Sequence, residues 1–169
     1  MKRLINTLLF VLAVCNPRTT NANTLNEIIE GECDSVPEWV IKKVITHESK
    51  SFKNGEPQPW PWTLNIDGKG WYYRSYNEAL VAATFAFENG AERLGVGFGQ
   101  IEWKWHSKRF GGSFAKALNP TENIKVVCEI LRESWQSKKV NSWEDAIAYY
   151  HRPVMDKKAR LYAEIVLSL

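Results

Sequence analysis

The sequence lacks any apolar run long enough to span a bilayer, which takes about 20 residues. Its first apolar run, Leu4–Val14, is well short of that length. A phosphate-binding loop is also missing, and the glycines at 95, 97 and 99 lack the strand–helix setting of a dinucleotide-binding fingerprint. The pair His47-Glu48 begins like a zinc-protease motif, but Ser51 stands where that motif has its second histidine. These absences argue against nucleotide-dependent and zinc-protease chemistry.

No internal repeat, charge block or low-complexity stretch divides the 169 residues, and no linker is long enough to separate two domains. That length suffices for one domain with a hydrophobic core. The three histidines, His47, His106 and His151, are too scattered to indicate a metal site. We therefore expect a single domain that uses neither a metal nor another cofactor.

The first residues have the pattern of an export signal. Lys2-Arg3 forms a basic start, the run Leu4–Val14 follows, and Thr20-Asn21-Ala22 is a small-residue cleavage site. The pattern predicts a signal peptide over residues 1–22 and a periplasmic or otherwise exported domain over residues 23–169. The run into Cys15 is a weaker match to a lipoprotein signal, so lipid attachment at Cys15 is an alternative.

Loss of the signal changes the charge and cysteine content. The whole chain carries a formal charge of +3, but the charged residues of the signal are all basic, so the exported domain is neutral. The balance therefore does not indicate nucleic acid or a membrane surface as a partner. Cys33 and Cys128 remain, and in an oxidising compartment they are expected to form a disulfide, the alternative being two buried thiols. A cysteine nucleophile is disfavoured in that compartment.

Helical periodicity and capping signals predict a mainly helical, α+β domain with one small hairpin. Possible capping boxes begin at Ser35 and Ser75, and Asp67-Gly68 is a hairpin turn signal. Helices are predicted over residues 36–49, 79–88, 120–136, 143–150 and 155–167, and hairpin strands over 62–66 and 69–73.

Glu48 is the most informative residue of the first predicted helix. It continues the apolar stripe of Ile41, Val44 and Ile45, where an apolar side chain is expected. A carboxyl group in that position is partly desolvated, which raises its pKa and lets it donate a proton near neutral pH. The alternative is that the helix ends there and the carboxylate is solvated. Glycosidic bond cleavage is the chemistry that needs such an acid.

Neighbouring residues support a sugar-binding site. Ser49 places a hydroxyl beside the acid, and Gln100 lies in a glycine-rich turn, where its amide could reach a substrate. The clusters Trp60-Pro61-Trp62 and Trp71-Tyr72-Tyr73 offer flat aromatic faces that suit sugar rings. Each feature also has a purely structural explanation, since the aromatic residues could form a core and the glycines a tight turn.

Together these residues resemble the soluble lytic transglycosylase family, lysozyme-like enzymes that cut peptidoglycan. Three family motifs occur in order between Cys33 and Tyr162. Glu-Ser is matched by His47-Glu48-Ser49, Gly-Leu-Met-Gln by Gly97-Phe98-Gly99-Gln100, and Ala-Tyr-Asn in part by Tyr149-Tyr150-His151. Residues 59–65 and the Tyr150-His151 pair resemble a subgroup associated with conjugative and secretion systems.

The resemblance implies a lysozyme-like fold, with Glu48 as the single catalytic acid and base. It implies that Ser49, Gln100, Tyr150 and His151 contact or orient the substrate, the glycan strands of peptidoglycan, and that no cofactor takes part. The aromatic side chains Trp62 and Tyr73 are expected to bind sugar rings. A monomer is the usual expectation for a small wall enzyme, and a secretion or conjugation apparatus is an expected partner.

Three residues depart from the family pattern. Gly99 replaces the usual Met, His151 replaces the usual Asn, and Glu102 stands where many relatives have Asn. A second carboxylate about 5 to 9 Å from Glu48 would permit lysozyme-like hydrolysis, so Glu102 leaves a muramidase as an alternative. A scaffold that binds glycan without cutting it, or a structural component of an envelope machine, is a further alternative.

Overall fold

The computed structural model describes residues 24–169, so the predicted signal peptide over residues 1–22 lies outside the described residues. The described chain has eight α-helices, one 3-10 helix and two antiparallel sheets. The helices are α1 (Leu25–Glu32), α2 (Glu38–Ser49), α3 (Tyr76–Glu88), α4 (Trp103–His106), η1 (Ser107–Phe110), α5 (Phe114–Ala117), α6 (Pro120–Trp135), α7 (Trp143–His151) and α8 (Lys157–Leu167). The strands are β1 (Lys50–Lys53), β2 (Glu56–Pro59), β3 (Thr63–Ile66), β4 (Lys69–Tyr72), β5 (Leu94–Val96) and β6 (Ile101–Glu102).

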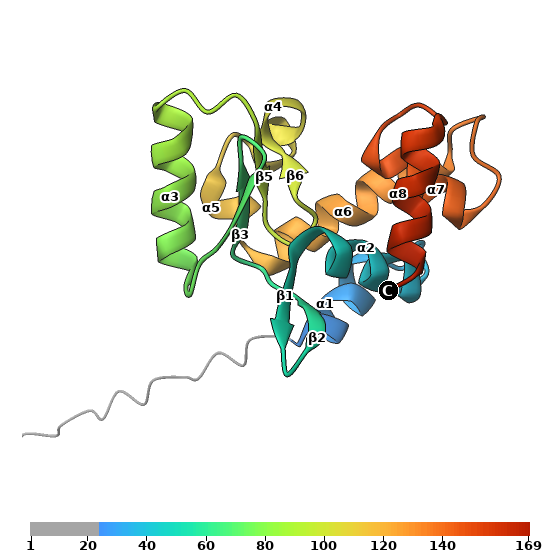
Figure 1. Cartoon of the computed structure of the whole chain (residues 1–169), viewed down its shortest axis with the longest axis horizontal. Coiled ribbons are helices and arrows are strands. Elements are labelled where there is room, and N and C mark those ends of the chain that lie inside the picture. Colours follow the sequence, from blue (N-terminus) through green and yellow to red (C-terminus); the bar gives the residue numbers. More distant parts are fainter. Residues whose placement is uncertain (1–23) are drawn as a thin grey trace, which may run out of the picture.

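The molecule has two sides joined by a central helix (Figure 1). The four-stranded sheet, in the order β4-β3-β5-β6, lies on one side with α3, α4 and α5, and α7 and α8 lie on the other. Helix α6 extends between the two sides and contacts α1, α5 and α7. The mainly helical, α+β architecture predicted from the sequence is confirmed.

Helix α2 lies at the centre of the core. The side chains of Val40, Ile41, Val44 and Ile45 are completely buried along one of its faces. At roughly 1.5 to 3 kcal/mol for each buried aliphatic side chain, this stripe fixes the helix firmly. The predicted capping box at Ser35 is wrong, because the helix begins at Glu38 and no side chain caps its first turn. Pro37, at the N-cap, instead orients the chain into the helix.

The structure has more β-structure than the sequence analysis predicted. The hairpin around Asp67-Gly68 is confirmed, and both turn residues have positive φ angles, 50° and 89°. A second hairpin, β1–β2, turns at Asn54-Gly55, where φ is 55° and 84°. Its Pro57 and Pro59 do prevent a helix, but a two-stranded ribbon tolerates proline because its outer edges form no ladder. Strands β5 and β6 and helices α1, α4 and α5 were not predicted either.

Most of the predicted helices and caps are present. Helices α3, α6, α7 and α8 lie where periodicity placed them, with ends shifted by a few residues. The side chains of Ser75, Asn119 and Ser142 each accept a hydrogen bond from a first-turn backbone N–H of α3, α6 and α7. None of the helices in the described range is long and apolar enough to cross a membrane.

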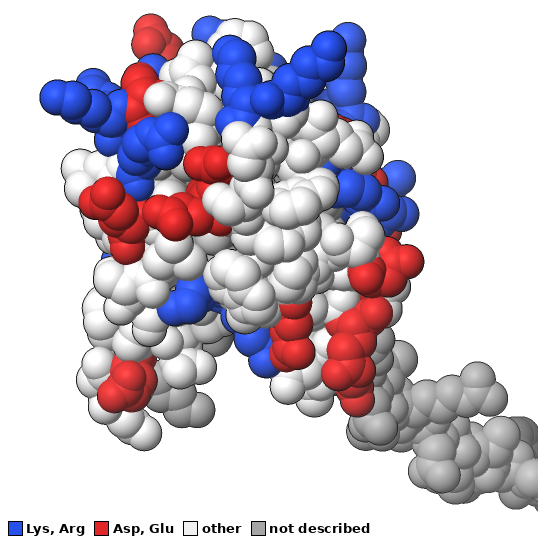
Figure 2. All heavy atoms as spheres, turned by 90° about the vertical axis from the view of Figure 1, so that its right-hand side faces the viewer, with Lys and Arg blue, Asp and Glu red and all other residues white. Residues whose placement is uncertain are grey.

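One face of the surface can be compared with the charge predicted for the exported domain. Seen from the α7–α8 side, most Lys and Arg side chains lie along the upper part, and a broad uncharged area occupies the middle (Figure 2). Acidic side chains lie between and below the basic ones. This face therefore has no continuous basic surface.

Cys33 and Cys128 form a disulfide that joins the end of α1 to the middle of α6. Their Cα atoms are 5.6 Å apart and the residues are separated by 95 positions in the chain. Both cysteines are buried. This bond is compatible with an exported chain, because oxidising compartments preserve disulfides.

Removing the disulfide is expected to destabilise the protein. Because the bond closes a long loop, the double variant Cys33→Ala/Cys128→Ala should lose about 2 to 5 kcal/mol of unfolding free energy, measured by urea denaturation. Reductant should lower the stability of the wild-type protein and leave that of the double variant unchanged. Equal stability of the wild-type protein with and without reductant would contradict this role.

Candidate functional site

Glu48 lies in the last turn of α2, directly beyond the buried stripe that anchors this helix. Its side chain is half-buried, as the apolar periodicity predicted for that position. Helix α8 packs against α2 and brings Tyr162 to the carboxylate. The Tyr162 hydroxyl donates a hydrogen bond of 2.5 Å to Glu48 Oε1. One carboxylate oxygen is therefore held by a neighbouring helix.

The surroundings of Glu48 favour its protonated form. Burial raises its pKa from 4.5 to about 7, while the hydrogen bond from Tyr162 and the positive charge of Lys50 act in the opposite direction. Burial outweighs both, so the protonated and the ionised forms of Glu48 are both accessible near neutral pH. A carboxyl group with this pKa can act both as an acid and, once ionised, as a base.

Two histidine rings, from α2 and α7, pack against the Tyr162 ring. His151, at the end of α7, stacks on Tyr162 with ring centroids 4.3 Å apart, and His47 of α2 meets it edge-on at 5.1 Å. Partial burial lowers the pKa of both histidines, so both are neutral near pH 7. Burial, with the nearby Glu48 charge, raises the pKa of Tyr150 and Tyr162 well above the usual tyrosine value, which keeps both hydroxyls protonated.

Tyr150 connects this cluster to the glycine-rich turn. Its hydroxyl donates a hydrogen bond of 2.8 Å to the carbonyl oxygen of Gly99. The Glu48 charge acts on the same hydroxyl. The structure thus brings Glu48 of the first sequence motif close to Tyr150 of the third. Tyr150 also holds the second motif, through the backbone carbonyl oxygen of Gly99.

The turn between β5 and β6 is held mainly by side-chain amides. Gln100 has a positive φ of 44°, and its Nε2 donates to the carbonyl oxygens of Gly97 and Thr63 at 2.9 and 3.1 Å. The buried Asn123 of α6 accepts from the Gly99 N–H and donates to two carbonyl oxygens, those of Val96 and Ala117. The amide nitrogen of Gln100 therefore braces the turn, and only its carbonyl oxygen, near Gly95, is left to meet a substrate.

The glycine at position 99, one of the three departures from the family pattern, has a steric explanation. A Cβ atom there would lie 2.3 Å from Val127 Cγ2 and 2.7 Å from the Tyr150 hydroxyl. A side chain larger than glycine does not fit at position 99, because Val127 and Tyr150 fill the space.

Replacing Gly99 with alanine is expected to lower the unfolding free energy by about 1 to 3 kcal/mol and to displace Tyr150. Gly31→Ala is the matched control, because a Cβ atom there meets nothing within 4 Å and the residue is helical. That variant should gain about 0.5 to 1 kcal/mol. Urea denaturation of both variants measures the difference, and equal stabilities would rule out the tight packing.

Ser49 has a different role from the one expected. Its side chain is completely buried, and its hydroxyl donates to the Ile45 carbonyl oxygen at 2.8 Å. The same hydroxyl accepts a hydrogen bond from the Trp60 backbone N–H at 3.2 Å. Ser49 therefore fixes the start of the aromatic segment to the end of α2, and its hydroxyl group is used within the fold.

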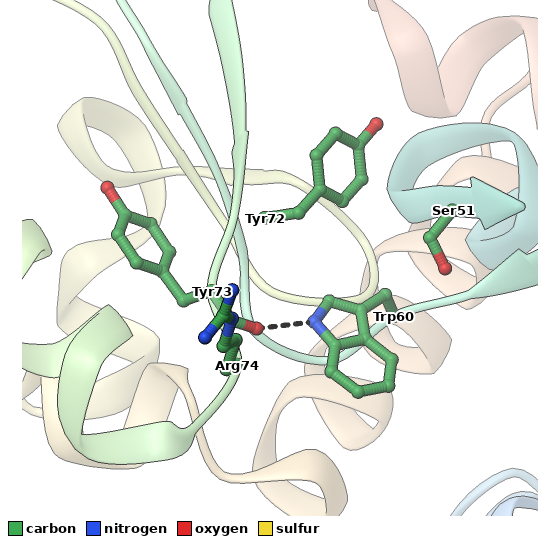
Figure 3. Close-up of a pocket in the computed structure, with 5 residues that line it drawn as sticks. All are labelled: Ser51, Trp60, Tyr72, Tyr73 and Arg74. Atoms are coloured by element: carbon green, nitrogen blue, oxygen red, sulfur yellow. Dashed lines mark hydrogen bonds between the residues drawn. The ribbon is translucent and has the colours of Figure 1, made fainter.

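An aromatic hollow of about 250 Å³ begins beside this anchor and is lined by Ser51, Trp60, Tyr72, Tyr73 and Arg74 (Figure 3). The indole N–H of Trp60 donates to the Tyr73 carbonyl oxygen at 2.8 Å. The Tyr73 ring points away from Trp60, so this residue borders the hollow mainly through its backbone (Figure 3). Trp62 does not line the hollow, because its ring packs edge-on against Trp60 and against the core. The rings that face the hollow are thus those of Trp60 and Tyr72, and not those of the pair Trp62 and Tyr73 that the sequence predicted to bind sugar.

Glu102 belongs to a different part of the surface. One of its carboxylate oxygens accepts a hydrogen bond of 2.9 Å from the Leu94 backbone N–H. Glu102 lines a second hollow of about 510 Å³, together with Phe87, Ala91, Glu92, Leu94, Trp103 and Lys104. The charges that shift the pKa of Glu48 do not include Glu102. The structure therefore does not place the two carboxylates in one cluster.

The described residues contain no group of three or more His, Cys, Asp or Glu side chains that could hold a metal ion. The histidines at 47 and 151 do lie on either side of Tyr162, a proximity that their spacing in the sequence did not reveal.

Sequence reasoning missed Tyr162, although a signal was present. On α8 the buried positions Ala159, Tyr162, Ala163 and Val166 recur with helical spacing, so Tyr162 places a hydroxyl on an apolar face, as Glu48 places a carboxyl. Asn123 interrupts the buried face of α6 in the same way. Glu48, Tyr162 and Asn123 thus share one sequence signal: each places a polar group on the apolar face of its helix.

Comparison with protein-family models, with curated proteins and with solved structures finds no match to this chain. The features of the molecule that bear on its function are therefore the Glu48 cluster and the aromatic hollow beside it.

Proposed function

We propose that this protein cleaves the β-1,4 bond between N-acetylmuramic acid and N-acetylglucosamine in peptidoglycan, as a lytic transglycosylase. The observation that carries the proposal is the half-buried Glu48, whose pKa is raised to about 7 beside an aromatic hollow. A proton donor with this pKa is what protonation of a glycosidic oxygen at neutral pH requires. Aromatic faces next to the acid suit the apolar faces of sugar rings.

The cluster around Glu48 favours one-carboxylate chemistry. Tyr162 and Lys50 are the charged or hydrogen-bonding groups that act on its pKa within the described range, and a second carboxylate is not among them. A hydrolase of the lysozyme type needs a second carboxylate within about 5 to 9 Å. Substrate-assisted reactions need only one, because the acetamido group of the sugar stabilises the developing cation.

The proposed reaction consumes no net proton and regenerates the protonated form of Glu48. Glu48 donates its proton to the glycosidic oxygen, the bond from that oxygen to C1 of the muramic residue breaks, and the acetamido oxygen stabilises C1. The ionised Glu48 then removes the proton from the 6-hydroxyl group, and O6 forms a bond to C1. The products are a 1,6-anhydromuramic end and a new 4-hydroxyl group, and Glu48 is protonated again.

The neighbouring residues would hold these groups in place. The Tyr162 hydroxyl fixes one Glu48 oxygen and leaves the other for the substrate. The stacked ring of His151 limits the movement of Tyr162. Tyr150 fixes the glycine turn, so that the carbonyl oxygen of Gln100 can accept a hydrogen bond from a sugar.

The proposal includes export and action on the cell wall, consistent with the Cys33–Cys128 disulfide. The association with a secretion or conjugation apparatus stays a prediction from the resemblance. Co-purification with components of such an apparatus is its test.

Mass spectrometry of purified peptidoglycan digested by residues 23–169 tests the proposed reaction. We expect 1,6-anhydro-muropeptides. New reducing ends would show hydrolysis by a muramidase instead. Glycan that is bound in a sedimentation assay but not cut would show a binding component of the envelope.

A further inference from the structure

The aromatic hollow beside Glu48 contains one charged side chain. Of the five residues that line it, only Arg74 is charged, and the others offer two rings, a hydroxyl group and backbone atoms. Trp60 and Tyr72 explain how the hollow could hold a sugar ring, but neutral sugars do not require an arginine. The guanidinium group therefore points to an additional, anionic feature of the ligand.

Hydrogen bonds fix the backbone around Arg74, whereas its guanidinium group has no partner in the described part of the chain. Its backbone N–H donates to Glu78 Oε2 at 3.0 Å, and the preceding carbonyl oxygen, of Tyr73, accepts from Trp60. Its guanidinium takes part in none of the ion pairs or hydrogen bonds found among residues 24–169. Arg109, by contrast, uses its donors on Glu129 and Glu133. Arg74 thus lines the hollow, and its guanidinium donors have no partner among the described residues.

The hollow is close enough to Glu48 for one glycan to reach both. Ser51 lines the hollow and follows Glu48 by three residues, a span of at most about 10 Å of extended chain. Lys50 lies between Glu48 and Ser51 in the chain, and its positive charge lowers the pKa of Glu48. A polymer that runs from the hollow to Glu48 therefore passes two cationic side chains, which favours an acidic glycan.

We propose that Arg74 is a specificity-determining residue that binds a carboxylate of the glycan. The inference rests on the proposed function and assigns to Arg74 the discrimination between muramic-acid-containing glycans and neutral N-acetylglucosamine polymers. The carboxylate belongs either to the lactyl group of a glycan without peptides or to the attached peptide stem. Both present the same planar anion, which matches the two-pronged geometry of a guanidinium group.

Binding measurements in the Glu48→Gln background test this role without turnover. The variant is Arg74→Gln, and Lys125→Gln is a control that removes one exposed positive charge from α6. Isothermal titration uses three fragments of equal length: glycan with peptide stems, glycan stripped of stems, and a neutral N-acetylglucosamine oligomer. Arg74→Gln should weaken binding of at least one acidic fragment about tenfold and change binding of the neutral oligomer less than twofold. The fragment that loses affinity identifies the source of the carboxylate.

Equal weakening for all three fragments would overturn the inference, because it would show a packing role for Arg74. An unchanged affinity, or a loss as large in the Lys125 control, would overturn it as well. Failure of the proposed function gives a different result: the wild-type protein then neither cuts peptidoglycan nor binds any of the fragments. If the wild-type protein cuts peptidoglycan and Arg74→Gln does not discriminate, only the inference about Arg74 fails.

Discussion

Replacing Glu48 with glutamine is expected to lower the rate of peptidoglycan cleavage by about 10³-fold or more, because it removes the acid with a pKa near 7 on which the proposed reaction depends. Glutamine has nearly the same shape and can still accept the hydrogen bond from Tyr162. The fold should therefore be intact. Release of soluble muropeptides from purified sacculi measures the rate. Near wild-type release by this variant would remove the central residue from the proposal.

The same substitution is expected to stabilise the protein above neutral pH. The pKa of Glu48 is about 7 in the folded state and 4.5 when unperturbed, so the folded state binds more protons between these values. The free energy of unfolding contributed by this group therefore falls as the pH rises from about 4.5 to 7. Glu48→Gln lacks this loss and should be more stable than the wild-type protein at pH 8 by about 3 kcal/mol or less. Urea denaturation at pH 5 and pH 8 measures the difference.

Glu102→Gln is the matched control for the loss of a carboxylate. Glutamine can still accept the hydrogen bond from the Leu94 N–H, and Glu102 lies outside the Glu48 cluster. We expect this variant to keep activity within about twofold of wild type. A loss comparable with that of Glu48→Gln would favour the two-carboxylate muramidase.

Replacing Tyr162 with phenylalanine is expected to shift the pH profile of cleavage upward and to reduce the maximal rate about ten- to 100-fold. The hydroxyl group donates to Glu48 and lowers its pKa, so its loss raises that pKa further above 7. Activity depends on protonated Glu48, so the descending limb of kcat/KM should move to higher pH. The rate falls because the carboxyl group loses the bond that orients it.

Phenylalanine keeps the ring that stacks on His151, so Tyr162→Phe tests the hydroxyl group and not the packing. Tyr149→Phe is the matched control, since Tyr149 lies on α7, which packs against α8, and its hydroxyl group forms no hydrogen bond within the described structure. That variant should retain the wild-type profile. An unshifted limb in Tyr162→Phe, or a shift to lower pH, would show that the hydroxyl group does not stabilise the carboxylate.

The sequence revealed the helix that carries the acid because local and tertiary effects agree there. The apolar stripe of α2 is completely buried, and Glu48 continues it at the next helical position. The hairpin at Asp67-Gly68 was equally clear, because both turn residues tolerate positive φ. At these places, the local pattern was sufficient to predict the structure.

The partners of Glu48 were harder to predict because they depend on tertiary contacts. Tyr162 lies 114 positions from Glu48, and only the packing of α8 on α2 brings them together. Sequence alone could not show that the Ser49 hydroxyl and the Gln100 amide nitrogen are used within the fold. Nor could it distinguish the rings of Trp60 and Tyr72, which face the hollow, from those of their neighbours.

Direct titration of Glu48 tests the central claim, that burial holds one carboxylic acid protonated near neutral pH. The side-chain carboxyl carbons of ¹³C-labelled glutamate are followed by NMR from about pH 3 to about pH 9, a range that includes the usual pKa values of carboxyl groups and histidines. The Glu48→Gln variant identifies the resonance of Glu48. We predict a midpoint near 7 for Glu48. A midpoint near 4.5, the ordinary value for glutamate, would show a solvated carboxylate and contradict the account.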